Sequence, residues 1–126
     1  MAELAYTQTG VSYDNLIGGT AITLMTANVE IEKLASKEVL KRGTLLGKKT
    51  EGGFAVVDSS VSTGEQIASV VLAHDVEVGT EANVVATVYT RGLFNRSALI
   101  VKQEADSAAK HEEELRQVGI YLTDAQ

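Results

Sequence analysis

The sequence predicts a single, mainly β domain, folded as a small barrel or sandwich, with one α-helix near its C-terminal end. Short segments of alternating or β-branched apolar residues recur between residues 20 and 101, separated by glycine-containing turns. After residue 106 the composition shifts to alanine, glutamate, lysine and leucine, which favour a helix. A chain of 126 residues is long enough for one domain and hardly for two.

Residues 1–19 are predicted to form a flexible N-terminal arm that precedes the β-rich domain of residues 20–126. The segment is polar, contains Gly10, Gly18 and Gly19, and shows no clear hydrophobic periodicity. Such a segment is flexible unless other contacts hold it. Its large apolar side chains include Tyr6, Tyr13, Leu16 and Ile17.

Residues 20–24 and 29–33 are predicted to be half-buried strands. Apolar side chains alternate with polar ones in both, as when Val29 and Ile31 alternate with glutamates. Residues 29–41 also contain good helix formers, so a helix there remains an alternative. The alternation favours a strand for the first half.

The middle of the chain predicts further strands. Residues 44–48 and 54–57 are expected to pair as a hairpin, because the Glu-Gly-Gly turn between them can supply the positive φ of a tight turn. The apolar run at 66–76 is typical of a buried central strand, and the β-branched residues 83–90 predict a second. The Arg-Gly pair that follows is expected to end this strand before another apolar segment at 93–101.

The C-terminal helix is predicted to span about residues 106–118. Asp106 or Ser107 is expected to cap its start, and Gly119 stands in a good position to stop it. Residues 120–122 are expected to pack back on the sheet. One stripe at helical spacing contains Ala108, His111, Leu115 and Val118.

The composition excludes several classes of function. The formal net charge is −6, whereas proteins that bind the nucleic-acid backbone or anionic lipid present basic surfaces. Without cysteine there is no disulfide and no thiolate metal site. The most apolar window, residues 16–27, is too short and polar to span a bilayer, and the first ten residues lack the features of a secretory signal. We therefore expect no nucleic-acid partner and no membrane association.

The stretch 42-RGTLLGKKT-50 looks at first like a phosphate-binding loop. Such a loop needs glycine, four residues, glycine, lysine and then serine or threonine. Here Gly43 and Gly47 are separated by three residues, and Arg42 stands where the first glycine belongs. We predict instead that Gly43 permits a turn into a strand and that other groups approach closely at Gly47.

Other residues with catalytic or ligand chemistry are predicted to be structural. His74 and Asp75 would point to opposite faces of a strand, so they cannot form a dyad. Asp75, Glu77 and Glu81 do not match a calcium loop, because Gly79 occupies the fifth place. A solvated acidic turn is therefore expected here.

His111 is predicted to lie on a solvated helix face. The sequence after it departs from the H-E-x-x-H zinc motif, because Leu115 stands where the second histidine belongs. The serines at 59, 60, 62 and 69 lack the G-x-S-x-G frame of a nucleophile. We therefore predict that the chain is not an enzyme and has no cofactor or metal.

The chain resembles the tailed-phage head decoration proteins of the lambda type. The likeness is carried by 15-NLIGG-19, 41-KRGTLLGK-48, 70-VVLAHDVEV-78 leading to 88-VYTRGLFNRSAL-99, and 115-LRQVGIYL-122. These blocks span nearly the whole chain, and their order and spacing are more specific than any one of them. One departure is 34-LASKEV-39, where family members often carry a glycine-centred turn.

The resemblance implies a β-tulip-like fold and a function as capsid cement. Family members form homotrimers on the outer surface of the expanded head, at local threefold sites. There they bind the major capsid protein and stabilise the shell against the pressure of packaged DNA. The resemblance further implies a virion protein made in the host cytoplasm, whose arm orders by pairing with capsid backbone. The expected capsid-binding residues of the arm are Tyr6, Thr7, Tyr13, Asp14, Leu16 and Ile17.

Alternatives remain open from the residues themselves. Leu16 and Ile17 could instead belong to the core of the domain. The chain could also be a virion-surface β module that binds a carbohydrate or a host surface through residues 58–64 and 91–97. A third interpretation, an enzyme subunit with a β-barrel core, lacks a convergent set of acid, base and nucleophile.

Overall fold

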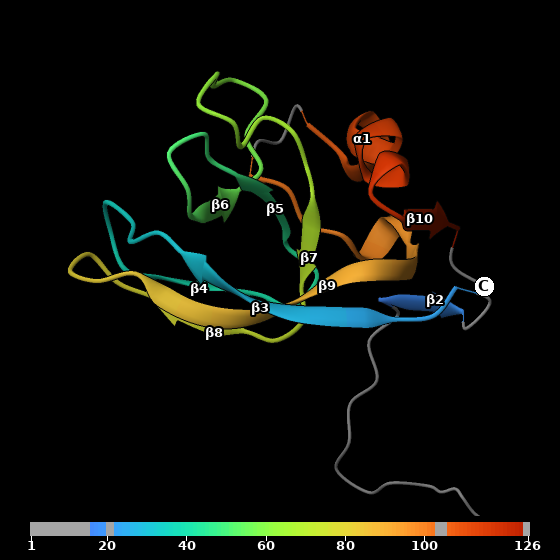
Figure 1. Cartoon of the computed structure of the whole chain (residues 1–126), viewed down its shortest axis with the longest axis horizontal. Helices are drawn as coiled ribbons and strands as arrows, with labels where there is room; N and C mark the ends of the chain where they lie inside the picture. The colour runs from blue at the N-terminus through green and yellow to red at the C-terminus, as the bar shows by residue number, and fades with distance from the viewer. Residues whose placement is uncertain (1–15, 20–21, 103–105, 125–126) are drawn as a thin grey trace, which may run out of the picture.

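The computed structural model describes residues 16–19, 22–102 and 106–124, and confirms a mainly β architecture with one short C-terminal α-helix. Five of the described strands close into a small barrel (Figure 1), because each pairs with the next and the last pairs with the first. All of these pairs are antiparallel except β3 with β6. In barrel order the strands are β9 (Val84–Asn95), β3 (Met25–Ile31), β6 (Phe54–Val56), β5 (Leu45–Lys48) and β7 (Val70–Leu72).

The predicted glycine hairpin is present between β5 and β6. Gly52 and Gly53 have φ angles of +101° and +73°, a region that side chains with a Cβ rarely adopt. The strands pair in register from Leu46 with Val56 to Lys48 with Phe54. The prediction of two strands around a glycine turn is therefore confirmed.

Strand β9 is longer than predicted, because residues 91 and 92 do not end it. Its register with β3 shifts between Met25 and Thr26, which marks an irregularity in the pairing. Gly92 has a φ of +156°, and a Cβ there would lie 2.6 Å from Leu24 Cδ2. Glycine thus lets the strand continue through a crowded, distorted position, and the predicted strand break is wrong.

The C-terminal half of β9 belongs to a second set of strands. Strand β10 (Ile120–Thr123) runs parallel to β9 residues 92–95. This pairing confirms the prediction that residues 120–122 pack back on the sheet. Strand β2 (Ile17–Gly19) pairs antiparallel with β9 at Phe94 and Leu93. The long strand therefore joins the barrel to both ends of the domain.

The run at 66–76 is not one long strand. Strand β7 ends at Leu72, and β8 (Val76–Val78) pairs antiparallel with β4 (Glu38–Leu40) as a separate two-stranded sheet. Between them, the Ala73 N–H donates to the Thr87 carbonyl, and the Ala73 carbonyl accepts from Arg42 Nη1. These contacts, which no local pattern reveals, turn the chain out of the barrel.

The first barrel strand also differs from its prediction. Residues 20 and 21 lie outside the described part of the chain, residues 22–24 form no strand, and β3 begins at Met25. It ends at Ile31, so the predicted strand at 29–33 is confirmed in its first part. The helical alternative for 29–41 is wrong, because residues 38–40 form β4.

Two apolar clusters form the core. One joins side chains of the barrel strands to those of the β4–β8 sheet and contains Ile31, Leu40, Leu46, Val70, Leu72, Val78 and Val88. The other lies between the barrel and the C-terminal segment and contains Leu16, Leu45, Val57, Ala68, Val71, Phe94, Ala108, Leu115, Ile120 and Leu122. Removal of these side chains from water is the main stabilising contribution to such a fold.

The C-terminal helix is shorter than predicted. A 3₁₀ turn at Ala108–His111 precedes α1 (Glu112–Gln117), and Gly119 ends the segment with a φ of +92°, as predicted. Within this segment Arg116 Nη2 lies 3.1 Å from Glu112 Oε2, an ion pair four residues apart. Val118 is 47% exposed, so the buried stripe stops at Leu115. None of the helices in the described residues is long and apolar enough to cross a membrane.

Candidate functional site

The predicted arm meets the domain at β2. The side chain of Leu16 is only 1% exposed and packs in the cluster that contains Phe94. Its carbonyl accepts the Asn95 N–H at 2.8 Å, which fixes the chain against β9. Ile17 is half-buried and packs against the same cluster. These contacts make Leu16 and Ile17 the first residues of the domain in the described structure.

The sequence predicted the boundary between arm and domain at residue 19, and Leu16 and Ile17 lie on the arm side of it. Leu16 lies in the core cluster and Ile17 packs against it, as expected from the alternative in which these two residues belong to the domain. The other four predicted arm residues lie outside the described part of the chain: Tyr6, Thr7, Tyr13 and Asp14. The arm considered below is therefore residues 1–15.

Two glycines in β2 allow the chain to lie close to its neighbours. A Cβ on Gly18 would be 2.6 Å from Thr123 Cγ2 and 3.2 Å from the carbonyl carbon of Phe94. A Cβ on Gly19 would be 3.1 Å from Leu93 Cδ2. Larger residues would push β2 away from β9, so the glycines of the 15-NLIGG-19 block hold the position at which the arm leaves the domain.

Two exposed apolar side chains lie against β9, just before the residues of β9 that pair with β2. Leu24 is 38% exposed and covers Gly92, while Met25 is 53% exposed and pairs in register with Arg91. In the described residues β2 pairs with β9 and with no other strand. We name β2 together with Leu24 and Met25 the arm-root surface. An edge strand beside apolar side chains suits contact with another polypeptide chain.

Arg42 of the K-R-G block has a structural role that the sequence did not reveal. Its Nη1 donates to the Ala73 carbonyl and to the Tyr89 hydroxyl, both at 2.8 Å. Its backbone N–H donates to Asp75 Oδ1 at 2.7 Å, and this bond holds the pKa of Asp75 below its ordinary value. Arg42 thus ties β9 to the chain between β7 and β8.

The resemblance to a phosphate-binding loop fails on the backbone geometry. The N–H groups of Gly43, Thr44 and Leu45 donate to the carbonyls of Leu72, Lys41 and Ile100, respectively. A phosphate cradle requires these N–H groups to point at the ligand. Gly43 has a φ of +97°, as a turn into a strand requires.

Gly47 lies at the close approach that the sequence predicted. A Cβ at this position would be 2.5 Å from the Ile67 carbonyl oxygen and 2.8 Å from Glu65 Cα. The glycine therefore lets β5 and the 58–69 loop come into contact.

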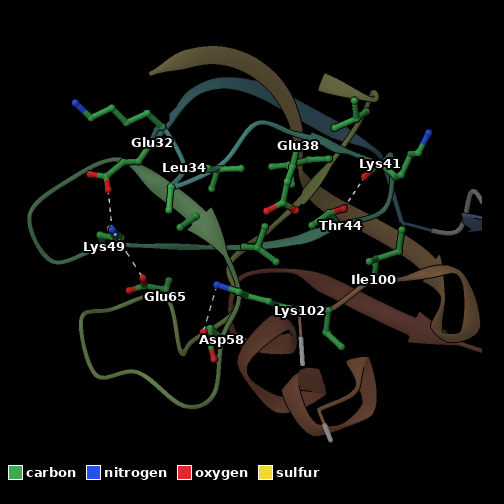
Figure 2. Close-up of a pocket in the computed structure, with 17 residues that line it drawn as sticks. Glu32, Leu34, Glu38, Lys41, Thr44, Lys49, Asp58, Glu65, Ile100 and Lys102 are labelled. Carbon is green, nitrogen blue, oxygen red and sulfur yellow. Dashed lines mark hydrogen bonds and ion pairs between the residues drawn. The ribbon is translucent and has the colours of Figure 1, made fainter. Parts of the chain in front are cut away.

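A pocket of about 410 Å³ opens between the 32–41 segment, β6 and residues 100–102 (Figure 2). Its volume falls in the range of small-molecule sites. Two ion pairs cross part of its charged lining: Lys49 Nζ is 2.7 Å from Glu32 Oε1, and Lys102 Nζ is 3.8 Å from Asp58 Oδ2. Four acidic and four lysine side chains line the pocket, so its wall carries no net formal charge.

The predicted acidic turn is also paired with lysines. His74 and Asp75 are both exposed, and Asp75 engages the Arg42 N–H and Lys41. Lys37 Nζ lies 3.1 Å from Glu77 Oε2. Among residues 16–19, 22–102 and 106–124, no group of three or more histidine, cysteine, aspartate or glutamate side chains is arranged to hold a metal ion.

His111 is the largest departure from the predicted site chemistry. It is 2% exposed, so the expectation of a solvated helix face is wrong. Nε2 lies 2.9 and 2.8 Å from the two oxygens of Asp106, and Nδ1 lies 2.7 Å from Glu114 Oε1. The helical spacing that His111 shares with Ala108 and Leu115, which are both buried, was the sequence signal that pointed towards its burial.

Ser59 and Ala68 complete this cluster from the 58–69 loop. Ser59 Oγ donates to Asp106 Oδ2 at 2.7 Å and lies 3.2 Å from His111 Nε2. The Ala68 N–H donates to Glu114 Oε1 at 2.9 Å. A serine, a histidine and carboxylates therefore meet here, although the serine lies 52 residues before the histidine in the sequence.

The arrangement does not match that of a hydrolytic triad. A catalytic histidine must offer a free nitrogen to remove the serine proton. Here the Ser59 proton is directed to Asp106, and both nitrogens of His111 face carboxylates. Such a histidine is stabilised as the charged imidazolium, which cannot act as a base. The cluster is a buried electrostatic contact.

Together, the fold and these contacts describe a small β domain that presents an edge strand at its start. A family model described as bacteriophage lambda head decoration protein D matches residues 5–120. The chain therefore belongs to this family of phage head decoration proteins. It is a structural protein that decorates the capsid of the virion. A search of curated proteins gave no match.

Proposed function

We propose that the chain binds as a homotrimer to the outer surface of an expanded phage head, at local threefold sites, and that it contacts the major capsid protein. In this position it stabilises the shell against the pressure of packaged DNA, without enzymatic activity. The observation that carries the proposal is the family match, which starts within the predicted arm and extends through the helix and into β10. Synthesis in the host cytoplasm and addition to the finished shell fit the same model.

The arm-root surface supports a contact through residues 1–15. An arm that adds a strand to the edge of another sheet draws affinity from main-chain hydrogen bonds, and its side chains set the register. Tyr6, Thr7, Tyr13 and Asp14 are the proposed contacts on the arm. Leu16 anchors the arm, because its burial and its hydrogen bond from Asn95 keep the exit point fixed on β9.

A trimer would make such weak contacts effective. Three arms on one rigid body bind with a high effective concentration after the first has engaged. Ordering each arm residue costs about 1–2 kcal/mol of backbone entropy, so the new hydrogen bonds and burial must offset this cost. The net charge of −6 suits an outer position, where no contact with DNA is required.

Deletion of residues 2–14 tests the proposal. We expect the shortened chain to keep its melting temperature and its trimeric mass, measured by light scattering, but to lose binding to undecorated expanded heads in a sedimentation assay. The matched control is Val85→Ala, which changes an exposed side chain outside the arm-root surface and leaves the arm intact. Full decoration by the shortened chain would exclude the arm as the binding element.

A further inference from the structure

The cluster around His111 joins two parts of the chain that no strand pairing connects. Asp106, His111 and Glu114 belong to the C-terminal helical segment, whereas Ser59 and Ala68 belong to the 58–69 loop. We name these five residues the His111 latch. Every polar contact between them lies between 2.7 and 3.2 Å, so the segment is held to the loop by one compact network.

The geometry requires a proton on each nitrogen of the imidazole. Ser59 directs its own hydrogen to Asp106, so its oxygen accepts from Nε2–H, as do the Asp106 oxygens. On the other side Nδ1–H donates to Glu114, which already accepts the Ala68 N–H. Loss of one proton would leave a lone pair facing a carboxylate and remove one charge-assisted hydrogen bond.

The charges on the surrounding elements do not replace this interaction. On the loop, Asp58 precedes Ser59 in sequence and pairs with Lys102 at 3.8 Å. On the helical segment, Lys110 precedes His111, and Glu112 is held by Arg96 and Arg116 at 3.0 and 3.1 Å. The apolar contacts of Ala108 and Leu115 remain whatever the proton state.

We propose that His111 is a proton-controlled latch, which holds the helical segment 108–117 against the 58–69 loop when it is charged and releases this segment locally when it becomes neutral. The barrel does not depend on this contact, because its closure rests on the pairing of β9 with β3 and β7. The segment continues through Gly119 into β10, so release also loosens the end of the chain beside Thr123 and β2. This inference is independent of capsid binding.

The titration of the two main partners sets the direction of the switch. Burial alone lowers the pKa of His111, but the hydrogen bonds and charges of Asp106 and Glu114 outweigh it and raise the pKa above its ordinary value of 6.5. Burial alone raises the pKa of Asp106, but the bonds from His111, Ser59 and the Ser107 N–H lower it below 3.8. The latch is therefore complete between pH 3.8 and pH 6.5, the ordinary pKa values of Asp106 and His111. It is lost as pH rises through the raised pKa of His111, and also as pH falls through the lowered pKa of Asp106.

Amide hydrogen exchange of the full chain tests the latch. Exchange is measured by NMR from pH 6 to pH 9.5 and corrected for the intrinsic effect of pH, while the His111 ring signals report its protonation. As pH rises, we expect the protection of α1 amides against exchange to fall at least tenfold, with the same midpoint pH as the His111 titration. The amides of β5 and β7 should keep their protection. Constant protection of α1 across that titration would overturn the proposal. Simultaneous loss of protection in α1 and the barrel would overturn it equally.

Three variants separate the latch from general effects of pH. His74→Gln removes the only other histidine of the chain, which is exposed, and should leave the pH response unchanged. His111→Gln should expose α1 amides at every pH and abolish the response. Glu114→Gln keeps the shape and the histidine but removes one carboxylate, so the midpoint should move to lower pH. An unchanged midpoint in Glu114→Gln would refute the assignment even if His111→Gln fails to fold.

Discussion

Leu16 decides where the domain begins, and its replacement by alanine is the most direct test of the structure. The side chain is 1% exposed and packs in the cluster with Phe94 and Ile120. If it belongs to the core, Leu16→Ala destabilises the folded domain strongly. If it belongs to a capsid-binding arm, the same change leaves the isolated protein almost unaffected.

The magnitude follows from the burial. Truncation removes three carbon atoms from an apolar environment, worth about 2.4 kcal/mol at roughly 0.8 kcal/mol each. The cavity that remains adds to this, and buried leucine-to-alanine changes cost about 2–5 kcal/mol in total. We expect about 3–4 kcal/mol, or a fall of about 10–15 °C in melting temperature for a domain of this size.

Thermal and urea unfolding of the wild type and of Leu16→Ala measure this difference. The matched control for stability is Met25→Ala, which should change the free energy of unfolding by no more than about 0.5 kcal/mol, since its side chain is 53% exposed. A loss below about 1 kcal/mol in Leu16→Ala would place Leu16 outside the core and restore it to the arm.

Two further changes probe the close contacts. Gly47→Ala should destabilise the domain by more than about 2 kcal/mol in urea unfolding, because the new Cβ would meet the Ile67 carbonyl oxygen at 2.5 Å. At Gly52 a new Cβ would meet no atom within 4 Å, so Gly52→Ala should lower the free energy of unfolding only by the roughly 1–2 kcal/mol that a positive φ costs an alanine. Equal losses of stability in Gly47→Ala and Gly52→Ala would contradict the crowding argument. Arg42→Lys keeps the charge but loses the fork that reaches Ala73 and Tyr89, and should cost about 1–2 kcal/mol. If Arg42→Lys has the same melting temperature as the wild type, a lysine ammonium stabilises this position as well as the half-buried guanidinium does.

Much of the fold followed from local patterns. The hairpin around Gly52 and Gly53 was predictable, because only a few residue types adopt the backbone angles of a tight turn. The end of the helix at Gly119 and the return of residues 120–123 to the sheet followed from the same local chemistry. The family was recognisable because such blocks recur in a fixed order along the chain.

Local patterns failed where distant contacts decide the outcome. Strand β9 passes through Gly92, because β10 pairs with it from residue 92 onward and supports the strand where a turn was expected. The run at 66–76 breaks after Leu72, because Arg42 and Thr87 capture the backbone of Ala73. Each of these partners lies at least 14 residues away in sequence, beyond the reach of any periodicity.

The candidate site shows the same division. The sequence predicted an arm that ends at residue 19, within the 15-NLIGG-19 block. It could not tell the last residues of the arm from the first residues of the core. Leu16 has the same apolar side chain in either role. Only its place in the buried apolar cluster, together with residues as distant in the sequence as Phe94, makes it a core residue.

The sequence by itself determined the class of this protein: a mainly β domain with a C-terminal helix, an acidic charge and the motif order of a phage head decoration protein. These properties depend on composition and on interactions between neighbours in the chain. The tertiary structure alone decided that the 58–69 loop covers His111, where Ser59 and Ala68 complete its contacts with Asp106 and Glu114. An ionisable side chain takes its charge from the groups that surround it in space, and Ser59 lies 52 residues away from His111 in the sequence.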